Sequence, residues 1–288
     1  MRFMSLNRDS IVVSLTVACV GVADAWAADP KGAEPVAKSV GAGLASGFSG
    51  DRGIDSHPSV IFAEDFESTD YKGRWDEARD KNGEALSLVR LGGDKDPFGQ
   101  SLKVKAVLGR NTGGGLTKWF ESADTLYVRF YTRFDSDCDY VHHFVTLRAN
   151  KSLRGGDRWS GFGGAGKKPA GDERFSTALE PWGNWRRWPA PGRWNFYSYW
   201  HEMTASPDGK YWGTSFKPEA QSNIQKDQWI CAEFMLKHNT PGKADGERDA
   251  DTFQECGRFH DRLLRCFSRR KATSTSSSRT LLFGRVQL

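Results

Sequence analysis

Cysteine is scarce in this sequence, and apolar runs long enough to cross a membrane are absent. Five cysteines occur in 288 residues, and no C-x-x-C pair or His/Cys cluster is present, so we expect neither a metal nor a cofactor. After the N-terminus no segment approaches the ~20 apolar residues of a membrane-spanning helix. A G-x-S-x-G elbow is also missing, which argues against Ser–His–Asp hydrolysis.

The main body of the chain also lacks net charge. The chain carries +5 overall, and residues 248–288 hold nine Lys or Arg against four Asp or Glu, which accounts for all of it. Basic proteins often bind nucleic acid or other polyanions. Because residues 28–247 are neutral, charge gives no support for nucleic-acid binding by the body.

The N-terminus has the pattern of an export signal. Arg2 and Arg8 precede a short apolar stretch, residues 11–22, and Ala25-Trp26-Ala27 matches an A-x-A cleavage site. We therefore predict a signal peptide over residues 1–27, a secreted or periplasmic protein, and no membrane attachment after cleavage. An ordinary buried N-terminal helix is the alternative.

The region after the signal is predicted to be a linker. Residues 28–58 are rich in Gly, Ala, Ser and Lys without a clear period, which is typical of a flexible segment. Of the cysteines, Cys138 and Cys231 lie in the body of the chain. In an oxidising compartment they can form one disulfide or remain two thiols, and the sequence leaves both open.

Period-two alternation of apolar and polar residues dominates residues 59–247. This pattern is typical of half-buried strands and indicates an all-β fold, which we predict to be a jelly-roll sandwich of two antiparallel sheets. The clearest segments are 60–66, 85–91, 101–108, 126–134, 141–149, 194–203 and 229–238.

Tryptophan is concentrated in one part of the chain. Seven of the eleven tryptophans lie within residues 155–212, and the run 180–194 combines them with Pro, Gly and Arg. Pro and Gly interrupt strands, so we expect a long loop with exposed rings. Aromatic rings stack on sugars and Arg binds carboxylates, which makes this loop a candidate glycan-binding region; its candidates are Trp182, Trp185, Arg187 and Trp188. Packing of these rings over the core is the alternative.

Three polar side chains share one face of the predicted strand 194–203. Tyr197, Tyr199 and His201 stand at spacing two. β-Elimination on a uronic acid needs a base, a group that neutralises the carboxylate, and an acid for the departing oxygen. Tyr and His can supply the proton transfers, with His142 and His143 as further candidates.

A second row of polar residues lies on the predicted strand 126–134. Arg129, Tyr131 and Arg133 alternate with apolar residues, and an Arg can bind a carboxylate through two hydrogen bonds. They are therefore candidates for substrate binding. Ordinary cross-strand pairing is the alternative for all these residues. Paired-carboxylate hydrolysis has weaker support, because no strand carries a row of acidic residues.

Several of these segments resemble a known protein family. The runs FYSYWHEM, HHFVTLRA and, most specifically, WICAEFMLKHNTPGKADGE resemble concanavalin-A-like jelly-roll proteins of the polysaccharide-lyase type, which are related to alginate and glucuronan lyases. The resemblance spans about residues 59–247. It implies an acidic polysaccharide as partner and catalytic Tyr, Lys, Arg or His on a concave sheet. The candidate matches are Tyr197, Tyr199, His201, Arg129, Arg133 and Lys237.

The chain departs from that family after residue 247. Residues 248–288 lose the alternation and gain Arg, Ser and Cys, where the family continues with further strands. We therefore expect the jelly roll to lack its last strands, and we hypothesise that this tail is out of frame. A genuine basic tail is the alternative.

Three functions remain open. The first is a secreted lyase that acts on a uronic-acid-containing polysaccharide. The second is a non-catalytic carbohydrate-binding or cell-surface module of the same fold. The third is nucleic-acid binding through the basic tail, which would depend strongly on salt.

Overall fold

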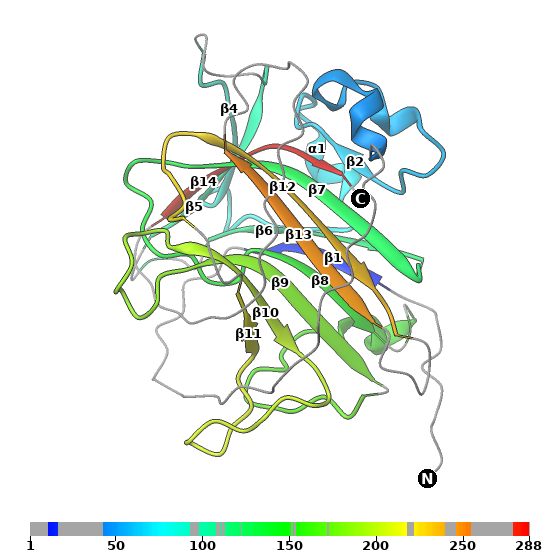
Figure 1. Ribbon diagram of the computed structural model, residues 1–288. Coiled ribbons are helices and arrows are strands. Elements are labelled where there is room, and N and C mark those ends of the chain that lie inside the picture. Colours follow the sequence, from blue (N-terminus) through cyan, green and yellow to red (C-terminus); the bar gives the residue numbers. More distant parts are fainter. Residues whose placement is uncertain are drawn as a thin grey trace.

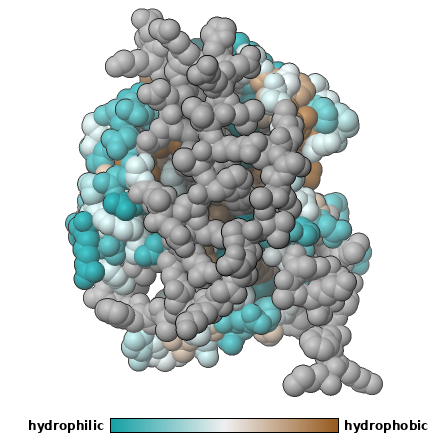
Figure 2. Space-filling view, viewed as in Figure 1, coloured by the Kyte–Doolittle hydropathy of each residue, from teal (hydrophilic) through white to brown (hydrophobic). Residues whose placement is uncertain are grey.

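A computed structural model gives the structure of the chain. It describes residues 11–16, 43–92, 98–107, 110, 113–121, 123–150, 152, 154–171, 173–217, 222–239, 246–254 and 279–287. Strands dominate these residues, and they form two sheets whose strand pairs are all antiparallel (Figure 1). In the view of Figure 2 hydrophilic residues cover much of the described surface.

The first sheet has the order β11-β10-β9-β8-β1-β6-β3. Its strands are β1 (Ile11–Thr16), β3 (Glu77–Arg79), β6 (Gly115–Phe120), β8 (Val145–Asn150), β9 (Arg174–Trp182), β10 (Arg193–Tyr199) and β11 (Thr214–Phe216). Strand β1 lies inside this sheet, between β6 and β8. It falls within the predicted signal peptide, so cleavage there would remove an interior strand.

The second sheet has the order β13-β12-β7-β14-β5-β4, and β2 pairs with β14 beside this path. Its strands are β2 (Ala63–Glu64), β4 (Leu86–Val89), β5 (Ser101–Ala106), β7 (Thr125–Phe134), β12 (Trp229–Lys237), β13 (Glu247–Gln254) and β14 (Arg279–Gln287). Strands β13 and β14 lie in the tail where we expected strands to be missing.

Within the part of the chain that the structure describes, helical structure is limited to short turns. It comprises η1 (Leu44–Gly47), η2 (Ser49–Asp51), η3 (Ile54–Ser56), α1 (Tyr71–Arg74) and η4 (Gly155–Trp159). The first three fall in the predicted linker, where Ile54 and Asp51 are buried. Residues 43–58 therefore belong to the folded body. Within the described residues no helix is long and apolar enough to cross a membrane.

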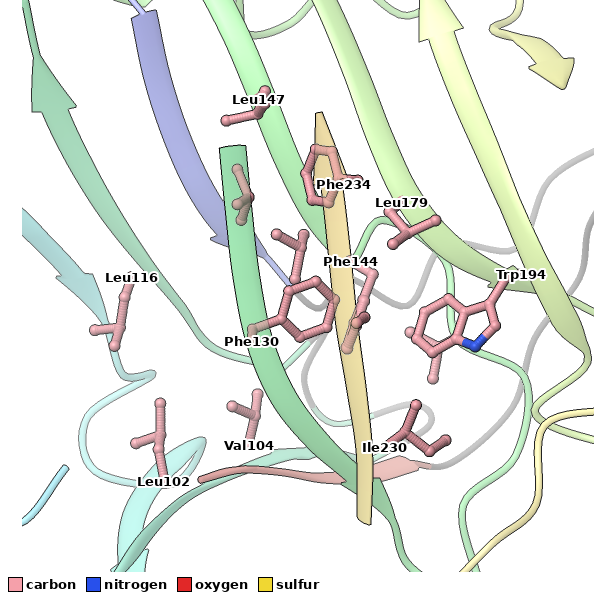
Figure 3. Packing of buried hydrophobic residues seen from close by; sticks show 14 of the residues in the cluster. Leu102, Val104, Leu116, Phe130, Phe144, Leu147, Leu179, Trp194, Ile230 and Phe234 are labelled. Carbon is pink, nitrogen blue, oxygen red and sulfur yellow. The ribbon is translucent and has the colours of Figure 1, made fainter. Parts of the chain in front are cut away.

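The apolar faces of the two sheets pack against each other and form the core. Phe130 of β7 and Phe234 of β12 come from one sheet, while Leu179 of β9 and Trp194 of β10 come from the other (Figure 3). Phe130 and Phe234 are at most 1% exposed. Loss of a ring this deeply buried costs about 3–5 kcal/mol. The predicted all-β sandwich of two antiparallel sheets is therefore confirmed.

Most predicted strands are present, with shifted ends. The segments at 101–108, 126–134 and 229–238 match β5, β7 and β12 closely. The segment at 60–66 is wrong beyond Ala63–Glu64. The segment at 141–149 begins as a strand only at Val145, because His143 has a φ of 59°, which no strand accommodates.

The two body cysteines are not joined. Cys138 and Cys231 are both buried, and no disulfide joins them. Cys138 packs in the core between the sheets, whereas Cys231 packs with Trp229 and Tyr131 on the outer side of the second sheet. The two side chains therefore lie on opposite sides of the second sheet. Of the two alternatives, the structure shows two separate thiols.

Candidate functional site

The outer face of the first sheet gathers polar side chains from β8, β9 and β10. Leu179 and Trp194 point into the core, so their neighbours Glu180 and Asn195 point outward, as strand alternation requires. Glu180 lies opposite Asn195 in the β9–β10 register. These strands therefore place a carboxyl and an amide side by side on the surface away from the core.

A pair of histidines contacts Glu180. The left-handed backbone at His143 lets both rings lie on the same side, with centroids 3.8 Å apart. The Nδ1 of His142 is 3.3 Å from Glu180 Oε1, and the Nδ1 of His143 is 3.7 Å from Glu180 Oε2. The backbone N–H of His143 also donates to Oε2 at 3.0 Å. One buried carboxylate thus holds both imidazoles.

A tyrosine pair stands next to the histidines. The ring of Tyr197 is 5.5 Å from that of His142, and its hydroxyl is 3.5 Å from the hydroxyl of Tyr199. The N–H of Gly213 donates to the Tyr197 hydroxyl at 2.9 Å. A Cβ at Gly213 would come within 2.5 Å of the Tyr197 ring, so this approach requires glycine.

The electrostatics of the cluster favour an ionised Glu180 and neutral phenols. Burial alone would raise the pKa of Glu180, but the charges and hydrogen bonds of His142 and His143 outweigh it and hold that pKa at about 2. Burial and the neighbouring His142 lower the pKa of His143. Burial is also the main cause of the raised pKa values of Tyr197 and Tyr199. Both tyrosines therefore hold their protons at neutral pH.

An arginine lies in the same row of the sheet as Tyr199. Arg148 of β8 is opposite Ser176 of β9, and Ser176 is opposite Tyr199 of β10. The guanidinium stacks on Phe162 at 4.2 Å, and its Nη1 is buried without a hydrogen-bond partner. Burial, together with the nearby Arg79, lowers its pKa to about 9. Among the described residues no carboxylate pairs with Arg148.

Further polar atoms on this face are buried without partners in the described structure. They are Asn195 Oδ1, Asn150 Oδ1 and Trp182 Nε1. Each side chain is at most 4% exposed. Buried polar atoms without partners are rare in native proteins and indicate that water, an ion or a ligand completes them.

Aromatic rings with cations lie on either side of this polar cluster. Trp119 and Trp159 contact each other at 4.9 Å, with Arg158 over Trp119. At the last residue of β9, Trp182 contacts Trp188 at 5.0 Å. Such ring surfaces can stack on sugars.

Four of the five predicted catalytic residues come together, namely Tyr197, Tyr199, His142 and His143. The placement of His201 on the Tyr197–Tyr199 face is wrong. Strand β10 ends at Tyr199, so the period of two does not extend to His201. Its side chain is 55% exposed and lies 3.8 Å from exposed Glu202.

The predicted binding residues of β7 and β12 lie on the other sheet. Arg129 donates to Asp51 and Glu233, each at 2.9 Å, and also to Tyr131. Other pairs join Arg133 to Asp227 and Lys237 to Glu247. The assignment of Arg129, Tyr131, Arg133 and Lys237 to the same surface as the tyrosine pair is therefore wrong, because β7 and β12 belong to the second sheet.

The Trp-rich run is only partly a loop. Residues 180–182 close strand β9, so Trp182 is buried at 4% exposure instead of standing free. Trp185 and Trp188 are half-buried, and Arg187 is exposed. The expected row of exposed rings is therefore not present here.

Three residues of this face escaped the sequence analysis: Glu180, Asn195 and Arg148. Pro181 favours a loop at Glu180, so the sequence predicts no strand at 174–182. The alternation in residues 141–149 does put Arg148 on a polar face. A strand predicted at 174–182 would also have placed Glu180 beside the histidines.

No family model matches the chain, and no curated protein sequence matches it. Two solved structures are similar. The PL-14 alginate lyase from Aplysia kurodai is 12% identical, covers 80% of this chain and 98% of its own, and has a TM-score of 0.47. The alginate lyase Aly36B is 16% identical, covers 65% of this chain and 80% of its own, and has a TM-score of 0.33. At such TM-scores neither likeness carries an argument about activity, which has to come from the site itself.

Proposed function

We propose that this chain is a polysaccharide lyase that cleaves a uronic-acid-containing polysaccharide by β-elimination on the outer face of the first sheet. The observation that carries the proposal is Arg148, a half-buried cation whose Nη1 is buried and which has no carboxylate partner among the described residues. It shares a row of the sheet with Tyr199. An unpaired guanidinium beside proton-transfer groups suits a substrate that brings its own carboxylate.

The reaction needs three roles, and this face has a group for each. Arg148, with Asn195 as a further hydrogen-bonding group, would neutralise the uronate carboxylate and so acidify the proton on C5. An imidazole of the His142–His143 pair, held by Glu180, would accept that proton. The C4–O4 bond then breaks, a C4=C5 double bond forms, and Tyr197 or Tyr199 protonates the departing oxygen.

The protonation states support this division of roles. The raised pKa values of the two tyrosines keep their phenol protons available for donation at neutral pH. Imidazole is the side chain that exchanges protons most readily in this range. No water is consumed, because elimination leaves an unsaturated sugar at one new end and a hydroxyl at the other.

Carbohydrate binding without catalysis is the second candidate, and the half-buried ring pair Trp119–Trp159 favours it. Such a module would retain glycan binding and release no unsaturated product. The two functions therefore separate in one assay.

The test is incubation of the chain with alginate, glucuronan, a heparin-like glycan and a neutral glycan, with ultraviolet absorbance of the unsaturated product as the signal. We expect absorbance to rise with an acidic glycan, and Tyr199→Phe or His142→Ala to lower the rate at least 100-fold. Tyr127→Phe is the matched control, because Tyr127 is 61% exposed and on the second sheet. Glycan binding without any product would establish the binding module instead.

A further inference from the structure

The two histidines and Glu180 also have the arrangement of a metal site. One ligand atom from each residue lies within 4.8 Å of the other two. A tetrahedral zinc ion with bonds of about 2.0–2.1 Å spaces its ligand atoms about 3.3 Å apart. His142 Nδ1 is 3.3 Å from Glu180 Oε1 and His143 Nδ1 is 3.7 Å from Oε2, so each imidazole is near that spacing from one oxygen of the carboxylate.

The donor types match the preference of a particular class of ion. Two imidazole nitrogens and one carboxylate oxygen suit Zn²⁺ and neighbouring divalent transition metals, whereas Ca²⁺ and Mg²⁺ prefer oxygen alone.

Burial leaves one side of the cluster open. Glu180 is 3% exposed and His142 14%, while His143 keeps 35% of its side chain in contact with solvent. An ion would therefore be held on the side that faces the sheet and remain accessible to solvent on the opposite side, as in metal sites that keep an open position.

An independent feature of the same place also indicates a ligand. Asn195 is 2% exposed, lies opposite Glu180 in the strand register, and has an Oδ1 without a described hydrogen-bond partner. A buried amide oxygen beside the carboxylate is suited to accept a hydrogen bond from a metal-bound water. It supplies the kind of outer contact that orients a metal site.

We propose that His142, His143 and Glu180 bind a divalent transition metal ion of the Zn²⁺ class on the outer face of the first sheet. The site does not depend on the proposed lyase activity. It does use the two imidazoles that the elimination would need. An imidazole that binds a metal through Nδ1 carries its proton on Nε2 and has no nitrogen left to act as a base, so bound Zn²⁺ would inhibit elimination.

The experiment uses the full chain, stripped of metal by a chelator, and Zn²⁺ titrated against a chromophoric indicator at neutral pH. We expect one ion per chain, with binding at least tenfold weaker in Glu180→Gln and in His142→Ala. His201→Ala is the matched control, because His201 also lies near a glutamate, Glu202, but is exposed and outside the cluster. Equal Zn²⁺ affinity in all four proteins, or no binding at 100-fold excess over micromolar protein, would overturn the proposal.

Co²⁺ provides a second readout that does not depend on activity. Visible d–d absorption should appear in the unaltered chain and be lost in His143→Ala, whose side chain is the most exposed of the three ligands and so threatens folding least. Circular dichroism checks that each variant is folded. Because no glycan is present, failure here leaves the lyase proposal standing, and a lyase without product leaves the metal site standing.

Discussion

The outer faces of the two sheets carry similar residues in opposite electrostatic situations. On the second sheet, burial alone would lower the pKa of Arg129, but its neighbours, Cys231 and Asp51 among them, raise it. On the first sheet, Arg148 has a lowered pKa of about 9 and no described carboxylate. Arg129 therefore has carboxylate partners within the protein, whereas Arg148 has none among the described residues.

The difference shows where a ligand is needed. Buried charges are normally paired, because an unpaired one is costly. The second sheet meets this requirement internally through Asp51, Glu233 and Asp227. On the first sheet, Arg148 has no carboxylate partner among the described residues, which is why we place the anionic substrate there.

The largest expected effect separates the two faces by activity. Arg148→Gln should lower the rate of product formation at least 100-fold, since the carboxylate would lose its neutralising cation. Arg133→Gln, on the other sheet, should leave the rate within twofold. The measurement is ultraviolet absorbance at saturating glycan, and equal rates for the two variants would contradict the assignment of the faces.

The next effect concerns stability on the second sheet. Asp51→Asn should lower the free energy of unfolding by about 1.5–3 kcal/mol, because a buried charged hydrogen bond to Arg129 is lost. Asn tolerates the left-handed backbone at this position, where φ is 58°. Urea denaturation measures the loss, and activity per folded molecule should not change. A fall in activity without a fall in stability would place substrate on this face after all.

A third arginine extends the comparison, because it is half-buried between the two sheets. Arg248 of β13 donates to Ser198 at 3.0 Å and lies over the Phe216 ring at 3.4 Å, and burial lowers its pKa to about 10. Arg248→Met should raise the free energy of unfolding by about 1–2 kcal/mol, since a well-packed apolar side chain replaces a desolvated charge. The midpoint of thermal unfolding measures it.

Activity in Arg248→Met should stay unchanged, which would distinguish an arginine held inside the sandwich from one left for substrate. Lower stability would show that the charge is needed where it lies. Arg248 also opens the segment hypothesised to be out of frame, and that hypothesis remains a prediction.

The smallest effect is expected at an exposed ion pair. Lys237 and Glu247 lie opposite each other on β12 and β13, with side chains 38% and 40% exposed. Lys237→Met should change the free energy of unfolding by less than about 1 kcal/mol, because water and salt screen such pairs. A larger loss in urea denaturation would mean that this edge of the sheet contributes more than its exposure indicates.

The sequence predicted the sandwich better than the site. Alternation located β7 and β12 because their apolar faces are buried, and the same alternation gave the outward direction of Tyr197 and Tyr199. Alternation does not show which sheet a strand joins. It therefore could not separate Arg129, on the second sheet, from Tyr197 and Tyr199 on the first. The sequence also could not predict the cluster of the two histidines with Glu180. Glu180 is 37 residues from His143, and the pairing of β8 with β9 brings them together.

The position of β14 has a consequence for how the chain is made. Residues 279–287 occupy the interior of the second sheet between β5 and β7. These residues leave the ribosome after all the other described strands. Until then, β5 and β7 lack β14, the strand that pairs with both of them. During that interval their unpaired edges can join other chains. Slow translation near the end, or truncation before residue 279, should therefore favour aggregates over the native sandwich.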